Sequence, residues 1–90
     1  MEFEYDAHKS ASNKSKHGIS FEAVKVLWAV PAVEIQARTM DELRFMLIGQ
    51  INGKCYSCIY TIRNKVIRII SARRSRDSEE KIYHEYVKKK

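Results

Sequence analysis

An Asn52-Gly53 dipeptide lies between two runs in which apolar and polar residues alternate, and it constrains the fold more than any other feature of the sequence. A type I′ turn requires positive φ at both central residues, and Asn-Gly satisfies this requirement well. The dipeptide therefore predicts a two-residue hairpin turn. Its register sets Phe45 opposite Tyr60 and Arg44 opposite Thr61.

Asn64-Lys65 predicts a second, weaker hairpin turn, which sets Tyr60 opposite Ile69 and Thr61 opposite Arg68. The two registers assign the same side chains to the same faces, because side chains alternate along a strand. Runs rich in β-branched and aromatic residues predict four strands, at 33–38, 42–51, 54–63 and 66–72. We therefore expect a four-stranded antiparallel meander.

The residues before these strands predict a short edge strand and two helices. The edge strand is the alternating FEYD at the N-terminus. Asp6 can cap a first helix that runs to about His17, where Gly18 follows as a closing residue. Ser20 can cap a second helix, which Pro31 ends.

A third helix is predicted from about 75 to 87, because acidic residues come first and lysines last, as the helix dipole favours. The element order is then β-α-α-β-β-β-β-α. This order predicts a single α+β domain over residues 1–90, with the last few residues frayed.

The two faces of the predicted meander differ in character. One face is apolar, and we expect the two N-terminal helices to cover it. Its residues are Leu43, Phe45, Leu47, Ile51, Cys58, Tyr60, Ile62, Ile67 and Ile69. The opposite face is mixed and carries Arg44, Met46, Ile48, Ser57, Ile59, Thr61, Arg63, Arg68 and Ile70.

Three arginines gather at one end of the mixed face: Arg44, Arg63 and Arg68. Glu42 lies alongside them, Arg74 is in phase if the strand continues, and Arg73 points to the other face. One interpretation is a set of surface ion pairs, which contribute little to stability. The other is a phosphate site, because the guanidinium groups outnumber the carboxylate and suit bidentate recognition of phosphate.

The distribution of charge also favours an anionic partner. The net charge is +6, yet residues 1–62 hold seven Lys and Arg against seven Asp and Glu, whereas residues 63–90 hold ten against four. A basic excess in one segment favours nucleic acid first and an acidic protein second. No apolar run approaches the roughly 20 residues that span a bilayer, and the first residues are acidic where a signal peptide is basic. We expect a cytoplasmic protein without a membrane partner.

Cys55 and Cys58 are separated by two residues, the spacing found in redox and zinc motifs. In a strand, however, positions i and i+3 point to opposite faces. Zinc would also need two further ligands, and the sequence offers no second Cys pair or His pair at suitable spacing. We therefore expect neither a metal nor another cofactor.

Several segments together resemble the BrnT family of type II toxins. They are FEYDAHKS, Asn13, KHGISFEAVKVLW at 16–28, Ala37-Arg38, Asp41-Glu42, Ile48-Gly49 and, most specific of all, TIRNKVIRIISARR at 61–74. The resemblance covers residue 2 to about residue 86. In one departure from the family pattern, serines at 10, 12 and 15 replace the usual alanine and leucine of the first helix.

The resemblance implies a RelE-like fold and a ribonuclease activity that arrests translation. It also implies a cognate BrnA-like antitoxin encoded beside the toxin, and a toxin homodimer within a toxin–antitoxin heterotetramer. In that family the antitoxin half binds operator DNA, so DNA is a partner only through the antitoxin.

Cleavage of RNA by its own 2′-hydroxyl needs a base, an acid and positive charge. The sequence has no Asp/Glu/His cluster for two metal ions, so a metal-independent route is favoured. We expect Arg63 and Arg68 to stabilise the phosphate, with Arg44 and Arg74 next.

The acid and the base are not assigned, and each candidate has a structural alternative. The candidates are His17, Tyr83 and Glu42. His17 can instead close a helix, Tyr83 can pack in the core, and Glu42 can simply pair with an arginine. Two other function classes also stay open, a non-catalytic RNA- or DNA-binding module and a basic protein that docks an acidic partner.

Overall fold

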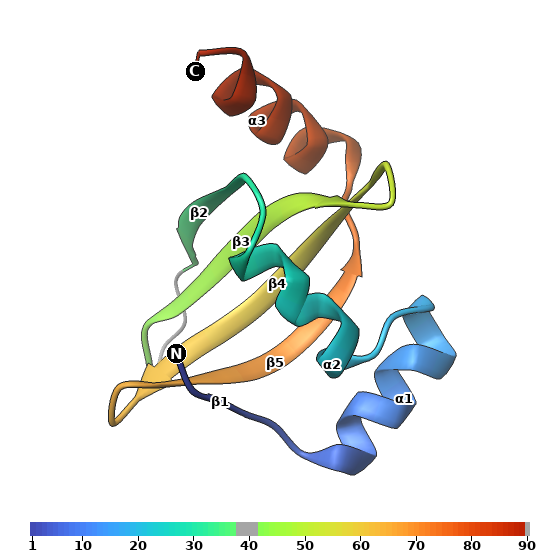
Figure 1. Cartoon of the computed structure of the whole chain (residues 1–90), viewed down its shortest axis with the longest axis vertical. Coiled ribbons are helices and arrows are strands. Elements are labelled where there is room, and N and C mark those ends of the chain that lie inside the picture. The colour runs from blue at the N-terminus through green and yellow to red at the C-terminus, as the bar shows by residue number, and fades with distance from the viewer. Residues whose placement is uncertain (38–41, 90) are drawn as a thin grey trace.

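The computed structural model describes residues 1–37 and 42–89 and has the predicted order of elements, with one added 3₁₀ turn (Figure 1). The elements are β1 (Phe3–Glu4), α1 (Ala7–His17), α2 (Phe21–Val24), the 3₁₀ helix η1 (Lys25–Trp28), β2 (Ala32–Ala37), β3 (Arg44–Ile51), β4 (Lys54–Arg63), β5 (Val66–Arg74) and α3 (Asp77–Lys88). Arg38 and Asp41, which belong to the family resemblance, lie outside the described residues.

The sheet has five strands in the order β1-β5-β4-β3-β2 and is mixed, so the prediction of a four-stranded antiparallel sheet is wrong in this respect. Strands β2 to β5 do form the predicted antiparallel meander. β1 joins its edge in parallel, with Phe3 beside Ile67 and Glu4 beside Arg68. A two-residue strand carries no local signal of its partner, because that partner lies more than sixty residues away.

Both hairpin turns and both registers are confirmed. Asn52 and Gly53 have φ of 53° and 78°, and Asn64 and Lys65 have φ of 52° and 67°, which are the positive values that a type I′ turn requires. Phe45 pairs with Tyr60. Thr61 pairs with Arg68.

A β-bulge in β5 changes the faces of the strand beyond Ile70. Tyr60 pairs with Ile69, but the preceding residue of β4, Ile59, pairs with Ser71, so one residue of β5 is left over. An extra residue moves every later side chain to the opposite face. Arg73 therefore lies opposite Ser57 and Arg74 opposite Tyr56, the reverse of the predicted orientation.

The main core lies on the apolar face under α1, α2 and η1, as predicted. It contains Ile19, Phe21, Val24, Leu27, Leu47, Cys58, Tyr60, Ile67, Ile69 and Ala72. A chain of aromatic contacts links β1 to the sheet, because Trp28 packs edge-on against both Phe3 and Tyr60, at centroid distances of 5.1 and 5.0 Å. Leu43 and Ile62 were expected in this core but are 51% and 52% exposed.

The polar helix α1 is fixed to the sheet by hydrogen bonds rather than by an apolar stripe. The Asn13 amide donates to the Ile19 and Ala72 carbonyls at 2.7 and 2.8 Å, and its oxygen accepts from the Ala72 amide at 3.3 Å. The buried Ser10 hydroxyl accepts from the Phe21 amide at 2.9 Å. One serine that departs from the family pattern thus satisfies a backbone donor at the start of α2.

Helix α3 covers the end of the mixed face near the β3–β4 turn. Its buried Tyr83 packs with Ile48 and Cys55, and Val33, Ile35 and Met46 border this second cluster. Figure 1 shows α3 at the opposite end of the molecule from α1. Helix α3 therefore does not cover the other end of the mixed face, where Arg44, Arg63 and Arg68 lie.

Candidate nucleic-acid interface

Five charged side chains, which we name the arginine cluster, lie at the end of the mixed face away from α3: Glu4, Glu42, Arg44, Arg63 and Arg68. Glu42 lies between two guanidinium groups, with its Oε2 2.9 Å from Arg63 Nη2 and its Oε1 3.6 Å from Arg44 Nε. Arg68 Nη1 lies 2.9 Å from Glu4 Oε2. The predicted proximity of Arg44, Arg63 and Glu42 is thus observed.

The hairpin registers create this cluster. β1 places Glu4 beside Arg68, and the β4–β5 register places Arg68 beside Thr61. The Thr61 hydroxyl, which is buried, donates to the Leu43 carbonyl at 2.7 Å and ties the entry of β3 to β4. Strands β1 and β5, which are distant in sequence, thereby bring Glu4 and Arg68 to one corner of the sheet.

The charges of the cluster act on one another. The Arg63 guanidinium, through its hydrogen bond, lowers the pKa of the Glu42 carboxyl, and the same contact raises the pKa of Arg63. The charge of Glu4 also raises the pKa of Arg63, although Glu4 itself pairs with Arg68. The cluster is therefore one electrostatic unit with three guanidinium groups and two carboxylates.

The Arg63–Glu42 and Arg68–Glu4 pairs of the cluster are partly exposed to solvent, whereas Arg44 Nε is buried and makes no hydrogen bond with the described residues. The Arg63 side chain is 54% exposed, and those of Glu4 and Glu42 are 45% and 26% exposed. Exposed pairs of this kind are weak and are screened by salt. The guanidinium groups can therefore exchange a carboxylate partner for a phosphate at little cost in stability.

Arg74 and Arg73 lie apart from the cluster, Arg74 because the bulge moves it to the other face and Arg73 because it lies at the α3 end of the mixed face. The Arg74 guanidinium carbon lies 5.7 Å from the centre of the Tyr56 ring, on the other face of the sheet. Arg73 donates two hydrogen bonds to Glu79, at 2.8 Å each, and so anchors the first turn of α3. Alternation alone could not place these two residues, because it does not reveal the bulge.

Glu79 is a buried carboxylate that the sequence reasoning did not single out. Besides Arg73, it accepts from the Ser57 hydroxyl at 2.8 Å and from the Arg76 amide at 3.0 Å. The hydrogen bonds from Arg73 hold the pKa of Glu79 at about 2 against the opposing effect of burial. Glu79 thus joins β4, β5 and the first turn of α3, which indicates a structural role.

The three candidates for proton transfer lie in three places. Glu42 is in the arginine cluster. Tyr83, on α3, is 7% exposed and packs against the sheet. Its position is that of a core residue, which was the alternative to a catalytic role. His17 lies at the far end of α1, where it lines a cleft of about 220 Å³ between α1 and β5.

This cleft, which we name the α1 cleft, is a second basic region. Its lining residues are Lys9, Ser12, Asn13, Lys16, His17, Phe21, Ile70 and Ser71. Lys9 and Lys16 are seven residues apart and so share one face of the helix. This spacing can be read from the sequence. It does not by itself indicate a site, because β5 forms the other wall of the cleft.

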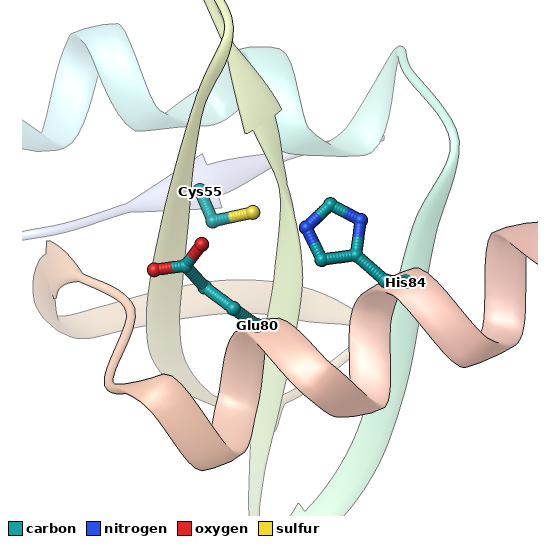
Figure 2. Close-up of side chains that lie close together, drawn as sticks. All are labelled: Cys55, Glu80 and His84. Carbon is teal, nitrogen blue, oxygen red and sulfur yellow. The ribbon is translucent and has the colours of Figure 1, made fainter.

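The two cysteines point to opposite faces, as predicted. Cys58 is in the main core, where burial raises the pKa of its thiol to about 12. Cys55 lies under α3, and its sulfur, a carboxylate oxygen of Glu80 and a ring nitrogen of His84 all lie within 4.8 Å of one another (Figure 2). The sequence did not reveal this grouping, because α3 supplies Glu80 and His84 from far along the chain.

No helix among residues 1–37 and 42–89 is long and apolar enough to cross a membrane. Residues 5–79 match the family described as "Ribonuclease toxin, BrnT, of type II toxin-antitoxin system". No curated protein matches the chain. The matched segment includes every element from α1 to β5 and ends in the first turn of α3.

Proposed function

This chain belongs to the BrnT family of ribonuclease toxins of type II toxin–antitoxin systems, and from that premise we propose that its arginine cluster binds and cleaves RNA without a metal ion. The observation that carries the proposal is the meeting of Arg44, Arg63 and Arg68 at one solvated corner of the sheet. Their three positive charges outnumber the two negative charges of Glu4 and Glu42. An RNA phosphate is the anion that such a corner would meet in a ribonuclease.

The proposed reaction is attack by the 2′-hydroxyl of RNA on its own phosphate. The 2′ oxygen bonds to phosphorus as a base removes its proton, and the bond to the 5′ oxygen breaks as that oxygen gains a proton. The products are a 2′,3′-cyclic phosphate and a free 5′-hydroxyl. Negative charge builds on the phosphate oxygens during attack, and the proposed role of Arg63 and Arg68 is to stabilise it.

Glu42 is the proposed base. It is the carboxylate between Arg44 and Arg63, and while the hydrogen bond from Arg63 lowers its pKa it is ionised but a weak base. When a phosphate takes over Arg63, Glu42 loses its strongest partner and becomes more basic. The acid that protonates the 5′ oxygen is not assigned within the cluster.

We further propose that cleavage of cellular RNA inhibits translation and that a cognate BrnA-like antitoxin neutralises the toxin. Membership of a type II family implies an antitoxin partner. The proposed assembly is a toxin homodimer within a toxin–antitoxin heterotetramer, in which operator DNA contacts only the antitoxin. Induction of the chain with and without its neighbouring gene tests this part through growth.

Arginine variants test the assignment of the site. Arg63→Ala and Arg68→Ala should each lower the rate of RNA cleavage by about 100-fold, the usual loss when one group that stabilises transition-state charge is removed. Arg74→Ala is the matched control, because the same residue type then disappears from the opposite face. Circular dichroism and melting curves show whether each variant is folded.

Three outcomes would contradict the proposal. If folded Arg63→Ala and Arg68→Ala cleaved RNA like the parent, the arginine cluster would not be the site. If cleavage stopped in EDTA and returned with Mg²⁺, the route would depend on a metal. If the parent bound RNA without cutting it, the chain would be a binding module instead.

A further inference from the structure

Cys55, Glu80 and His84 converge from two elements that are distant in sequence. Cys55 lies at the start of β4, and Glu80 and His84 lie on α3, four residues apart and therefore on one face of the helix. Figure 2 shows the sulfur, the carboxylate and the imidazole turned toward a common point between strand and helix. Their donor atoms all lie within 4.8 Å of one another.

We propose that these three side chains bind a divalent cation of the zinc class and that the ion clasps α3 to the sheet. Thiolate, imidazole and carboxylate are the donor types that zinc takes in proteins. When the thiol has lost its proton to solvent, the thiolate and the carboxylate together balance the charge of the ion. The neutral imidazole completes a set of three ligands, and water takes the fourth position.

The geometry requires only a small adjustment. Zinc bonds of about 2.0–2.3 Å in a tetrahedron place ligand atoms roughly 3.5 Å apart, so separations of up to 4.8 Å have to shrink by at most about 1.3 Å. Cys55 is fixed, since it is 3% exposed. Glu80 is half-buried and His84 exposed, so rotation of these two side chains can close the gap without movement of the backbone.

The position of the site indicates what the ion would do. Helix α3 is held by the Arg73–Glu79 pair at its first turn and by Tyr83 against the sheet, and Tyr83 is the helix's one residue in the small second cluster. Bonds to Glu80 and His84 would tie the middle of the helix directly to β4. The site lies eight residues along β4 from Arg63, or roughly 26 Å at 3.3 Å per residue, so it is separate from the arginine cluster.

The test is a titration of the full, untagged chain with Co²⁺, after treatment with EDTA and dialysis. Co²⁺ bound to a thiolate gives a charge-transfer band in the near ultraviolet, and tetrahedral Co²⁺ gives strong visible bands. We expect both signals to saturate at one ion per chain, Zn²⁺ to abolish them by displacement, and Zn²⁺ to raise the melting temperature of the parent.

Variants assign the signals to the three residues. Cys55→Ser should lose the charge-transfer band although Cys58 is still present, because Cys58 lies on the other face. Loss of a residue that merely supports a metal ligand costs about 10- to 100-fold in affinity, so His84→Gln and Glu80→Gln should cost at least about tenfold. The matched controls are His8→Gln and Glu85→Gln, which replace exposed residues of the same types.

The proposal fails if the parent shows no thiolate band, if Cys55→Ser binds like the parent, or if His8→Gln weakens binding as much as His84→Gln does. If Cys55→Ser does not fold, His84→Gln decides the matter, because an exposed side chain can be replaced without disturbing the core. None of these results depends on RNA cleavage. The metal site and the proposed function can therefore fail independently.

Discussion

Among residues 1–37 and 42–89, two sets of arginine–glutamate pairs differ in burial, and the comparison separates solvent-exposed charges from a structural anchor. In the arginine cluster, Arg63 and Glu42 meet at 2.9 Å with the arginine side chain 54% exposed. Under α3, Arg73 and Glu79 meet at 2.8 Å with side chains only 21% and 10% exposed. The same residue types at nearly the same distance thus stand in different solvent environments.

Burial determines what each pair can do. Desolvated charges depend on each other, and removal of one partner leaves the other uncompensated. Solvated charges keep water as an alternative partner and can exchange it for phosphate. Arg73 is therefore committed to Glu79, whereas Arg63 and Arg68 stay accessible from solvent, as the proposed contact with RNA requires.

The largest expected effect concerns stability. Glu79→Ala should lower the free energy of unfolding by about 3 kcal/mol, because Arg73 would keep its charge without a partner. Urea unfolding followed by circular dichroism measures this loss. Glu42→Ala is the matched control and should hardly change the midpoint. Equal losses in the two variants would remove the distinction between the pairs.

The pH dependence of stability is the next expected effect. The pKa of Glu79 is about 2 in the folded chain against 4.5 as its ordinary value, so the unfolded chain binds the proton more readily. Its contribution is complete above about pH 4.5 and is lost as the pH falls from there toward 2. Melting temperatures across this range should fall more steeply for the parent than for Glu79→Gln. Parallel curves would show that Glu79 does not titrate in this way.

The smallest expected effect concerns the salt dependence of RNA binding. Each phosphate contact with single-stranded RNA contributes about −0.7 to the slope of log affinity against log salt. Arg63→Ala should reduce the slope by about that amount, and Arg74→Ala should leave it unchanged. Fluorescence anisotropy with an RNA whose 2′-hydroxyls are methylated gives the slope without cleavage. A smaller slope for Arg74→Ala alone would move the interface to the other face.

The parts of the fold that sequence could predict are those set by local chemistry. Asn52-Gly53 and Asn64-Lys65 have the positive φ that their turns demand, so the registers of three strands followed from four residues. Asp6 and Ser20 cap α1 and α2, as their side-chain oxygens allow. The position of Arg63 near Glu42 followed from the same registers, whereas the pairing of Arg68 with Glu4 was added only by the structure.

The features that could not be predicted depend on contacts between distant segments. The bulge at Ile70 interrupts a run that reads as regular alternation, so Arg73 and Arg74 were assigned to the wrong faces. Leu43 and Ile62 are apolar and in phase with the core, yet both are exposed at the hairpin ends. The grouping of Cys55 with α3 required the placement of that helix, which no local pattern specifies.

One measurement tests the central claim most directly, namely mapping of the RNA contact by NMR. The backbone amide signals of the whole chain and the Nε–H signals of the arginines are recorded while an RNA with methylated 2′-hydroxyls is added. We expect the signals of Arg44, Arg63 and Arg68 to shift and that of Arg73 to stay in place, because Glu79 holds it. Shifts confined to Lys9, Lys16 and His17 would place the RNA in the α1 cleft and contradict the account.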